Sequence, residues 1–133
     1  MARRLRGRAA DGGPDFLGLF RRSSELVTLK PGEVLFKKGD PAKHMYVVLS
    51  GTVRVGDGNT VFEEISPGGI VGEMALIDEA PRSATVTAAG DCMLAQIDER
   101  RFLLLVQNTP GFALNVMRLL SQRLRHMNAL VKA

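Results

Sequence analysis

The run from Gly69 to Thr85 contains the residue types of a phosphate-binding site. Gly72 permits a turn or a close backbone approach, and the residues after it can form one helical turn with free N–H groups. Arg82 adds a planar guanidinium that can donate to two phosphate oxygens at once. Glu73 repels an anion, so its presence indicates a ligand that also carries sugar hydroxyls. Phosphate and ribose in one small site predict a nucleotide.

Each of these residues, taken singly, has an ordinary structural explanation. A Glu and an Arg nine positions apart most often form a surface ion pair worth less than about 1 kcal/mol. Gly72 alone would be a turn, and Ser83 alone would be a solvated strand residue. Pro81, however, favours an extended residue before it and sets the approach to Arg82, while the small Ala84 leaves room for a ligand. The combination, rather than any one member, predicts the binding site.

Between residues 25 and 98 the chain alternates short β-prone segments with turn residues, which is typical of a sandwich or barrel. The Asp57-Gly58 pair between two alternating segments predicts a hairpin. The expected strands are Leu26–Leu29, Val34–Phe36, Met45–Leu49, Thr52–Val55, Val61–Ile65, Thr85–Thr87 and Met93–Ile97. The phosphate-binding run therefore lies within a β-domain.

After Asp98 the hydrophobic period changes to that of helices. A first helix ends near Asn108, and Thr109-Pro110 predicts the start of a second, because proline at the first helical position loses no hydrogen bond. The second helix has a heptad-like stripe made of Ala113, Met117, Leu120, Leu124, Met127 and Val131. A second stripe beside it is made of Phe112, Val116 and Leu119. One stripe suffices to pack on the β-domain, so dimerisation through the other and purely intramolecular packing are equally open.

Length and cysteine content predict one cytoplasmic domain. The chain has 133 residues, a single cysteine, Cys92, and no secretory signal. No apolar run approaches the roughly 18 residues that span a bilayer. We therefore expect a protein of a reducing compartment with no membrane span.

The net charge of +4 comes from the N-terminus. Four arginines lie in the first eight residues, namely Arg3, Arg4, Arg6 and Arg8. Without them the chain has 14 basic and 14 acidic side chains, which argues against nucleic-acid binding by this chain alone. We expect residues 1–14 to form a flexible basic tail and residues 15–133 to form the domain, although such a tail could also contact nucleic acid or anionic lipid.

The chain resembles the cyclic-nucleotide-binding domain family, which includes the bacterial catabolite activator, the regulatory subunits of cyclic-AMP-dependent kinase and the cytoplasmic ends of cyclic-nucleotide-gated channels. The resemblance extends from Leu26 to the C-terminus. It is carried by Pro31-Gly32-Glu33-Val34-Leu35-Phe36, Lys38-Gly39-Asp40, Tyr46–Val53, Gly72–Leu76 and Pro81–Thr85. It implies a mainly β fold: an eight-stranded β-roll (double-stranded β-helix or jelly roll) over about 25–98, with a short cassette helix and two C-terminal helices over about 99–131. The family usually has several helical turns before the first strand, whereas only Phe16–Phe20 is available here.

The resemblance also implies roles for individual residues. Glu73 would accept a hydrogen bond from the ribose 2′-OH, and Arg82 would pair with the cyclic phosphate. The rest of the phosphate cradle would be Ser83 and the amides of Gly72, Met74, Ala75 and Ala84. Further candidates are Val53, Val55 and Val71 for the wall beside the base, and Arg123, Met127 and Leu130 for a lid. Ser83 favours cyclic AMP over cyclic GMP, because threonine at this position is associated in bacterial members with a response to cyclic GMP.

Two functions are compatible with these features, and a third is disfavoured. The resemblance implies a non-catalytic sensor whose C-terminal helix moves when a 3′,5′-cyclic nucleotide binds and so signals to a partner, an effector protein or a fused domain. The alternative is a ligand-independent jelly-roll module that dimerises or docks through residues 111–131. A metal-dependent enzyme of the cupin type would need several histidines, but only His44 and His126 are present, and Cys92 alone cannot hold an iron–sulfur cluster. We therefore expect neither catalysis nor a metal or cofactor.

Overall fold

The computed structural model of the chain describes residues 16–132 except residues 24, 79 and 110. The side chains of residues 16, 19, 23 and 126–132 lie outside this description, as does the expected tail at residues 1–14. The strands are β1 (Glu25–Leu29), β2 (Val34–Phe36), β3 (Met45–Ser50), β4 (Val53–Asp57), β5 (Thr60–Ile65), β6 (Ile70–Val71), β7 (Thr85–Ala88) and β8 (Cys92–Ile97). The helices are α1 (Phe16–Ser23), the 3₁₀ turn η2 (Glu73–Leu76), α2 (Glu99–Asn108) and α3 (Phe112–Lys132).

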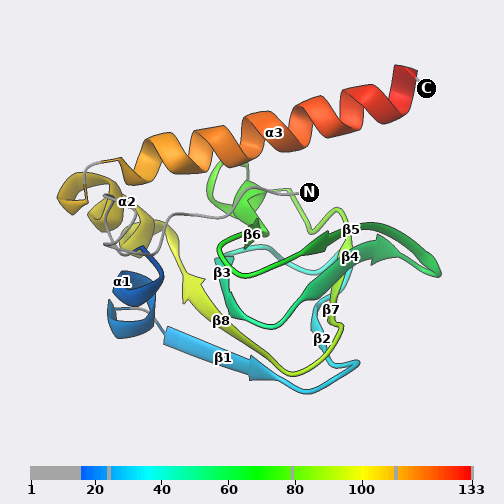
Figure 1. Cartoon of the computed structure of the whole chain (residues 1–133), viewed down its shortest axis with the longest axis horizontal. Helices are drawn as coiled ribbons and strands as arrows, with labels where there is room; N and C mark the ends of the chain where they lie inside the picture. Colours follow the sequence, from blue (N-terminus) through cyan, green and yellow to red (C-terminus); the bar gives the residue numbers. More distant parts are fainter. Residues whose placement is uncertain (1–15, 24, 79, 110, 133) are drawn as a thin grey trace.

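The strands form two four-stranded antiparallel sheets that roll into one body (Figure 1). One sheet has the order β1-β8-β3-β6 and the other the order β2-β7-β4-β5. The hairpin predicted at Asp57-Gly58 joins β4 to β5, with Asp57 opposite Thr60. This architecture confirms the predicted eight-stranded β-roll with a cassette turn and two C-terminal helices.

The seven segments expected to be strands all form strands, and the eighth strand is β6. This strand has only two residues, set between Gly69 and Gly72, so its sequence shows no measurable alternation. It pairs with β3, where Val71 lies opposite Tyr46. Its importance is positional, because β6 leads directly into the cassette turn.

Strand β3 divides the apolar interior into two cores because it is buried on both faces. Tyr46 and Val48 point into the space between the sheets, where the first core also contains Val53, Ile65 and Leu94. The alternate side chains of β3 face the helices and contribute to a second core. This core consists of Phe20, Met45, Val47, Leu49, Ile70, Ala95, Ile97, Leu105, Phe112, Val116 and Leu119. Strand β6, which precedes the cassette turn η2, also belongs to both cores, through Val71 in the first and Ile70 in the second.

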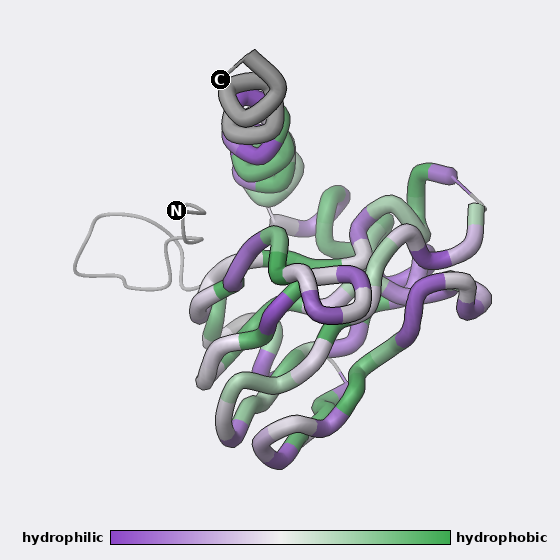
Figure 2. The backbone as a smooth tube through the Cα atoms, turned by 90° about the vertical axis from the view of Figure 1, so that its right-hand side faces the viewer, coloured by the Kyte–Doolittle hydropathy of each residue, from purple (hydrophilic) through white to green (hydrophobic). Residues whose placement is uncertain are grey.

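Helix α3 packs on the body mainly through one of its two apolar stripes, with Leu120 of the other stripe at the edge of the contact. Phe112, Val116 and Leu119 are 0, 6 and 6% exposed, whereas Met117 and Leu124 of the heptad-like stripe are 58 and 62% exposed. Figure 2 looks along α3, which lies on one side of the β-roll. Within the described residues, Met117 and Leu124 of the heptad-like stripe are therefore not used in intramolecular packing. No helix in the described part of the chain is long and apolar enough to cross a membrane.

Candidate functional site

Gly72 occupies a position that only glycine suits. Its φ of 72° lies in the left-handed region, and it begins the 3₁₀ turn η2. A Cβ atom built on Gly72 would lie 2.5 Å from Nη1 of Arg82 and 3.3 Å from the carbonyl oxygen of His44. Both reasons for glycine that the sequence suggested, the turn and the close approach, therefore hold at this residue.

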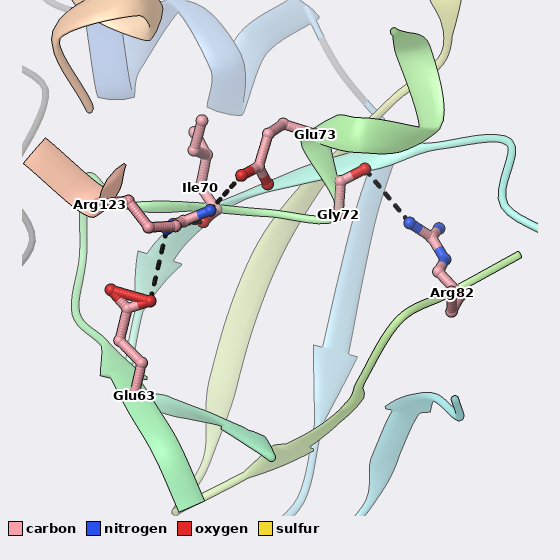
Figure 3. Close-up of polar contacts among 6 residues, drawn as sticks. All are labelled: Glu63, Ile70, Gly72, Glu73, Arg82 and Arg123. Carbon is pink, nitrogen blue, oxygen red and sulfur yellow. Dashed lines mark hydrogen bonds and ion pairs between the residues drawn. The ribbon is translucent and has the colours of Figure 1, made fainter. Parts of the chain in front are cut away.

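The backbone of Arg82 is held by the loop between β2 and β3. The Arg82 N–H donates to the carbonyl of Asp40 at 2.9 Å, and the Gly39 N–H donates to the carbonyl of Arg82 at 2.8 Å. The side chain is 8% exposed. Its Nη1 donates to the carbonyl of Gly72 at 3.2 Å (Figure 3). Its Nη2 donates to the carbonyl of His44 at 2.8 Å. The guanidinium therefore lies against the start of the cassette turn.

The buried charge of Arg82 has no carboxylate partner among the described residues. Its Nε is buried without a hydrogen-bond partner there. The Cζ atom lies 3.9 Å from the ring centroid of Phe36 and 6.0 Å from that of Tyr46. Burial lowers the pKa of the Arg82 guanidinium from its usual range, and nearby Tyr46, Asp40 and Glu73 partly offset this effect. Burial also raises the pKa of Tyr46, against the influence of Arg82.

Glu73 is the other charged side chain that is buried in the described part of the chain, at 6% exposure. Its Oε1 accepts a hydrogen bond from Nη1 of Arg123 on α3. The same guanidinium donates from Nη2 to the carbonyl of Ile70 at 2.7 Å, and its Nε lies 3.4 Å from Oε2 of Glu63. Figure 3 shows Arg123 extended between the two carboxylates. One side chain thus connects α3 to β5, β6 and η2.

Arg123 offsets part of the negative charge that Glu73 places beside the predicted anion site. The offset is partial, because the same guanidinium also pairs with Glu63. Only Oε1 of Glu73 is engaged by Arg123, and Oε2 accepts no hydrogen bond from the described residues. That oxygen remains an acceptor for a hydroxyl donor.

The remaining predicted cradle residues directly follow Glu73 or Arg82 in the sequence. Met74 is 53% exposed, Ser83 is exposed, and Ala75 and Ala84 are half-buried. The Ala75 amide donates to the Gly72 carbonyl at 3.1 Å, so it closes the cassette turn. The Ala75 amide, predicted as a donor to the ligand, is thus already bonded in this structure.

The predicted base wall lies inside the roll, and only part of the predicted lid is described. Val53 and Val71 are 0 and 2% exposed, and half-buried Val55 packs against the same core. Arg123, predicted as part of the lid, reaches the site by donating to Glu73. No signal in the sequence indicated this partner. The side chains of Met127 and Leu130 lie outside the described residues.

Comparison with known proteins matches residues 26–109 to the family described as Cyclic nucleotide-binding domain. The chain belongs to this family. It is 38% identical over 101 residues to a cyclic nucleotide-gated potassium channel of Mesorhizobium japonicum, a match covering 76% of this chain and 28% of the channel. It is 34% identical over 108 residues to a lysophospholipase of Coccidioides immitis, covering 77% of this chain and 7% of that protein. The family domain here thus spans less than a third of either relative.

Solved structures agree with this assignment. The catabolite activator protein of Thermus thermophilus is 29% identical, with a TM-score of 0.75 over 87% of this chain and 57% of that one. The EAL enzyme Bd1971 in its cAMP-bound form is 29% identical, with a TM-score of 0.57 over 81% of this chain and 30% of the other. The same enzyme in a cGMP-bound form matches with a TM-score of 0.58, 29% identity and coverages of 79% and 29%.

Proposed function

We propose that this chain is a non-catalytic sensor that binds a 3′,5′-cyclic nucleotide and couples its binding to α3. The observation that carries the proposal is the buried guanidinium of Arg82, which lacks a carboxylate and has an unbonded Nε–H in the described structure. Removing a cation from water destabilises the folded protein by about several kcal/mol unless a nearby anion compensates the charge. The phosphate of a ligand would supply that anion.

Glu73 narrows the ligand to one that carries a hydroxyl group near its phosphate. Arg123 occupies Oε1 of Glu73 and leaves Oε2 to accept a hydrogen bond. A 3′,5′-cyclic nucleotide has a singly charged phosphate and a free 2′-OH on one rigid ring system. A rigid ligand loses little conformational freedom on binding, so these two contacts can act together.

The family supports the ligand class, whereas the preference for cyclic AMP rests on Ser83. The EAL enzyme related to this chain has structures with cAMP and with cGMP, so it favours neither base for this protein. Ser83 follows the predicted phosphate-binding arginine directly and is exposed at the site. We therefore propose cyclic AMP first and cyclic GMP as its competitor.

The route to an output is the contact between Glu73 and Arg123. Because the two oxygens of one carboxylate would bind the helix and the ribose, ligand binding and docking of α3 should stabilise each other. A bound nucleotide would thereby shift α3 toward its position against the roll. Its exposed Leu114, Met117 and Leu124 would then face a second copy, an effector protein or a fused domain.

Titration calorimetry with cyclic AMP tests the ligand assignment. We expect one saturable site in the wild type and an affinity at least about 10- to 150-fold weaker in Arg82→Ala, the loss expected for one charged hydrogen bond. Arg54→Ala is the matched control, because Arg54 is an exposed arginine that pairs with Glu64 at 3.1 Å. Absence of binding by the wild type, or equal affinity of Arg82→Ala, would overturn the assignment. Competition with cyclic GMP determines the preferred base.

A further inference from the structure

The guanidinium of Arg82 lies over the ring of Phe36, the last residue of β2. The Cζ atom is 3.9 Å from the ring centroid. The ring of Tyr46 lies beside that of Phe36, with centroids 6.1 Å apart and planes tilted by 32°. The buried cation is thus in contact with an aromatic face instead of a carboxylate.

An aromatic ring contacts the face of a guanidinium, whereas a carboxylate contacts its N–H groups. The five N–H donors of arginine lie in the plane of the group, and a ring over the face engages none of them. A carboxylate would occupy two donors and cancel the charge. The ring of Phe36 can therefore stabilise the buried cation without using any of its N–H donors or cancelling its charge.

Phe36 and Gly72 also confine Arg82 sterically. A Cβ atom placed on Gly72 would lie 3.3 Å from Cε2 of Phe36 and 2.5 Å from Nη1 of Arg82. The guanidinium therefore lies in a narrow slot between the ring and the start of the cassette turn. Within this slot Nη1 and Nη2 each donate to a backbone carbonyl, while the Nε–H has no partner among the described residues.

We propose that Phe36 is a positioning residue for the phosphate site, holding the Arg82 guanidinium in this slot. The inference rests on the proposed function, because it concerns the same anion. The ring acts through Arg82 and does not itself contact the ligand. Phe36 also packs against the core between the sheets, so the test must separate positioning from packing.

A double-mutant cycle makes this separation. Phe36→Leu removes the ring but keeps the apolar bulk, and we expect it to weaken cyclic AMP binding by about 2- to 30-fold. Phe36→Tyr keeps the ring and should bind within about twofold of the wild type. In an Arg82→Lys background, which retains the charge without the planar group, Phe36→Leu should change the affinity by less than about twofold. Phe36→Met provides the same comparison should the leucine variant fail to fold.

Proton NMR of the Arg82 Nε–H supplies a readout that packing alone does not move. The ring current of Phe36 should shift this resonance upfield, and Phe36→Leu should remove that shift; Arg82→Lys assigns the signal. Phe102→Leu is the matched control. Phe102 packs on Phe112, with ring centroids 5.6 Å apart, in the core beneath the helices and not in the core that contains Phe36. The control substitution should lower stability without moving the resonance.

The outcomes distinguish this inference from the proposed function. An equal loss of affinity on Phe36→Leu in both backgrounds, or an Nε–H resonance that the substitution does not move, would overturn the positioning role while nucleotide binding stands. A wild type that does not bind cyclic nucleotide would overturn the proposed function itself.

Discussion

Gly72→Ala is the substitution whose effects the structure defines most sharply. A residue with a side chain pays about 1–2 kcal/mol in the left-handed region that Gly72 occupies, at φ 72°. The new Cβ would also lie 2.5 Å from Nη1 of Arg82, which is the end of a flexible side chain. The guanidinium can move away more cheaply than the backbone can, so the variant should fold with Arg82 displaced from its slot.

The expected result is a modest loss of stability with a large loss of affinity. We expect the free energy of unfolding to fall by about 1–2 kcal/mol. Loss of one charged hydrogen bond to the phosphate should weaken cyclic AMP binding by about 10- to 150-fold. Chemical denaturation and titration calorimetry on the same preparation measure the two quantities separately.

Gly32→Ala is the matched control. Gly32 has a φ of 83°, but a Cβ at this position meets no atom within 4 Å. Gly32→Ala should have the same backbone strain as Gly72→Ala, but its affinity for the nucleotide should stay within about twofold of that of the wild type. If both variants lose affinity equally, or if Gly72→Ala binds normally, the explanation by displacement of Arg82 is refuted.

Three further predictions concern the helix, the core and alkaline pH. Arg123→Leu should lower stability by about 1–3 kcal/mol and should abolish the slowing of α3 amide exchange by cyclic nucleotide, measured by mass spectrometry; persistent slowing would contradict the coupling through Glu73. Phe112→Ala, at 0% exposure, should cost about 3–5 kcal/mol of unfolding free energy, whereas Met117→Ala, at 58%, should stay within about 0.5 kcal/mol; urea denaturation that ranks them the other way would reverse the assignment of the packing stripe. Burial raises the pKa of Tyr46 above 10.0, so the stability it confers is present below that pH and is lost as the pH rises through the folded value. The wild type should therefore lose stability relative to Tyr46→Phe in alkaline urea titrations, and parallel curves for the two proteins would refute this linkage.

The strands and helices were predictable because their signals are local. Turn residues bounded seven of the strands, and Thr109-Pro110 correctly predicted a break after the first C-terminal helix. The predicted start of the second helix at this pair was wrong, because α3 begins at Phe112, after Gly111 with a φ of 86°. The strand β6 was missed because two residues cannot display alternation. Which stripe of α3 contributes most to the core was not predictable, because both stripes are apolar and lie side by side on the helix.

The site was predictable only where its residues are neighbours in the sequence. Gly72, Glu73 and Arg82 lie within one short run, and the structure brings them together as the sequence indicated. Their partners come from distant elements: Arg123 lies 50 positions from Glu73, and His44 lies 38 positions from Arg82. The carbonyl of His44 could not be predicted as a partner, because every residue type has a backbone carbonyl. Phe36 could not be distinguished from an ordinary apolar core residue.

The central claim is that one ligand supplies both the phosphate for Arg82 and the hydroxyl for Glu73. Comparing cyclic AMP with its 2′-deoxy analogue, in the wild type and in Glu73→Ala, tests this claim most directly. The account predicts that loss of the 2′-OH weakens wild-type binding by about 10- to 150-fold and Glu73→Ala binding by less than about twofold. The same factor in both proteins, or a wild type indifferent to the 2′-OH, would contradict it.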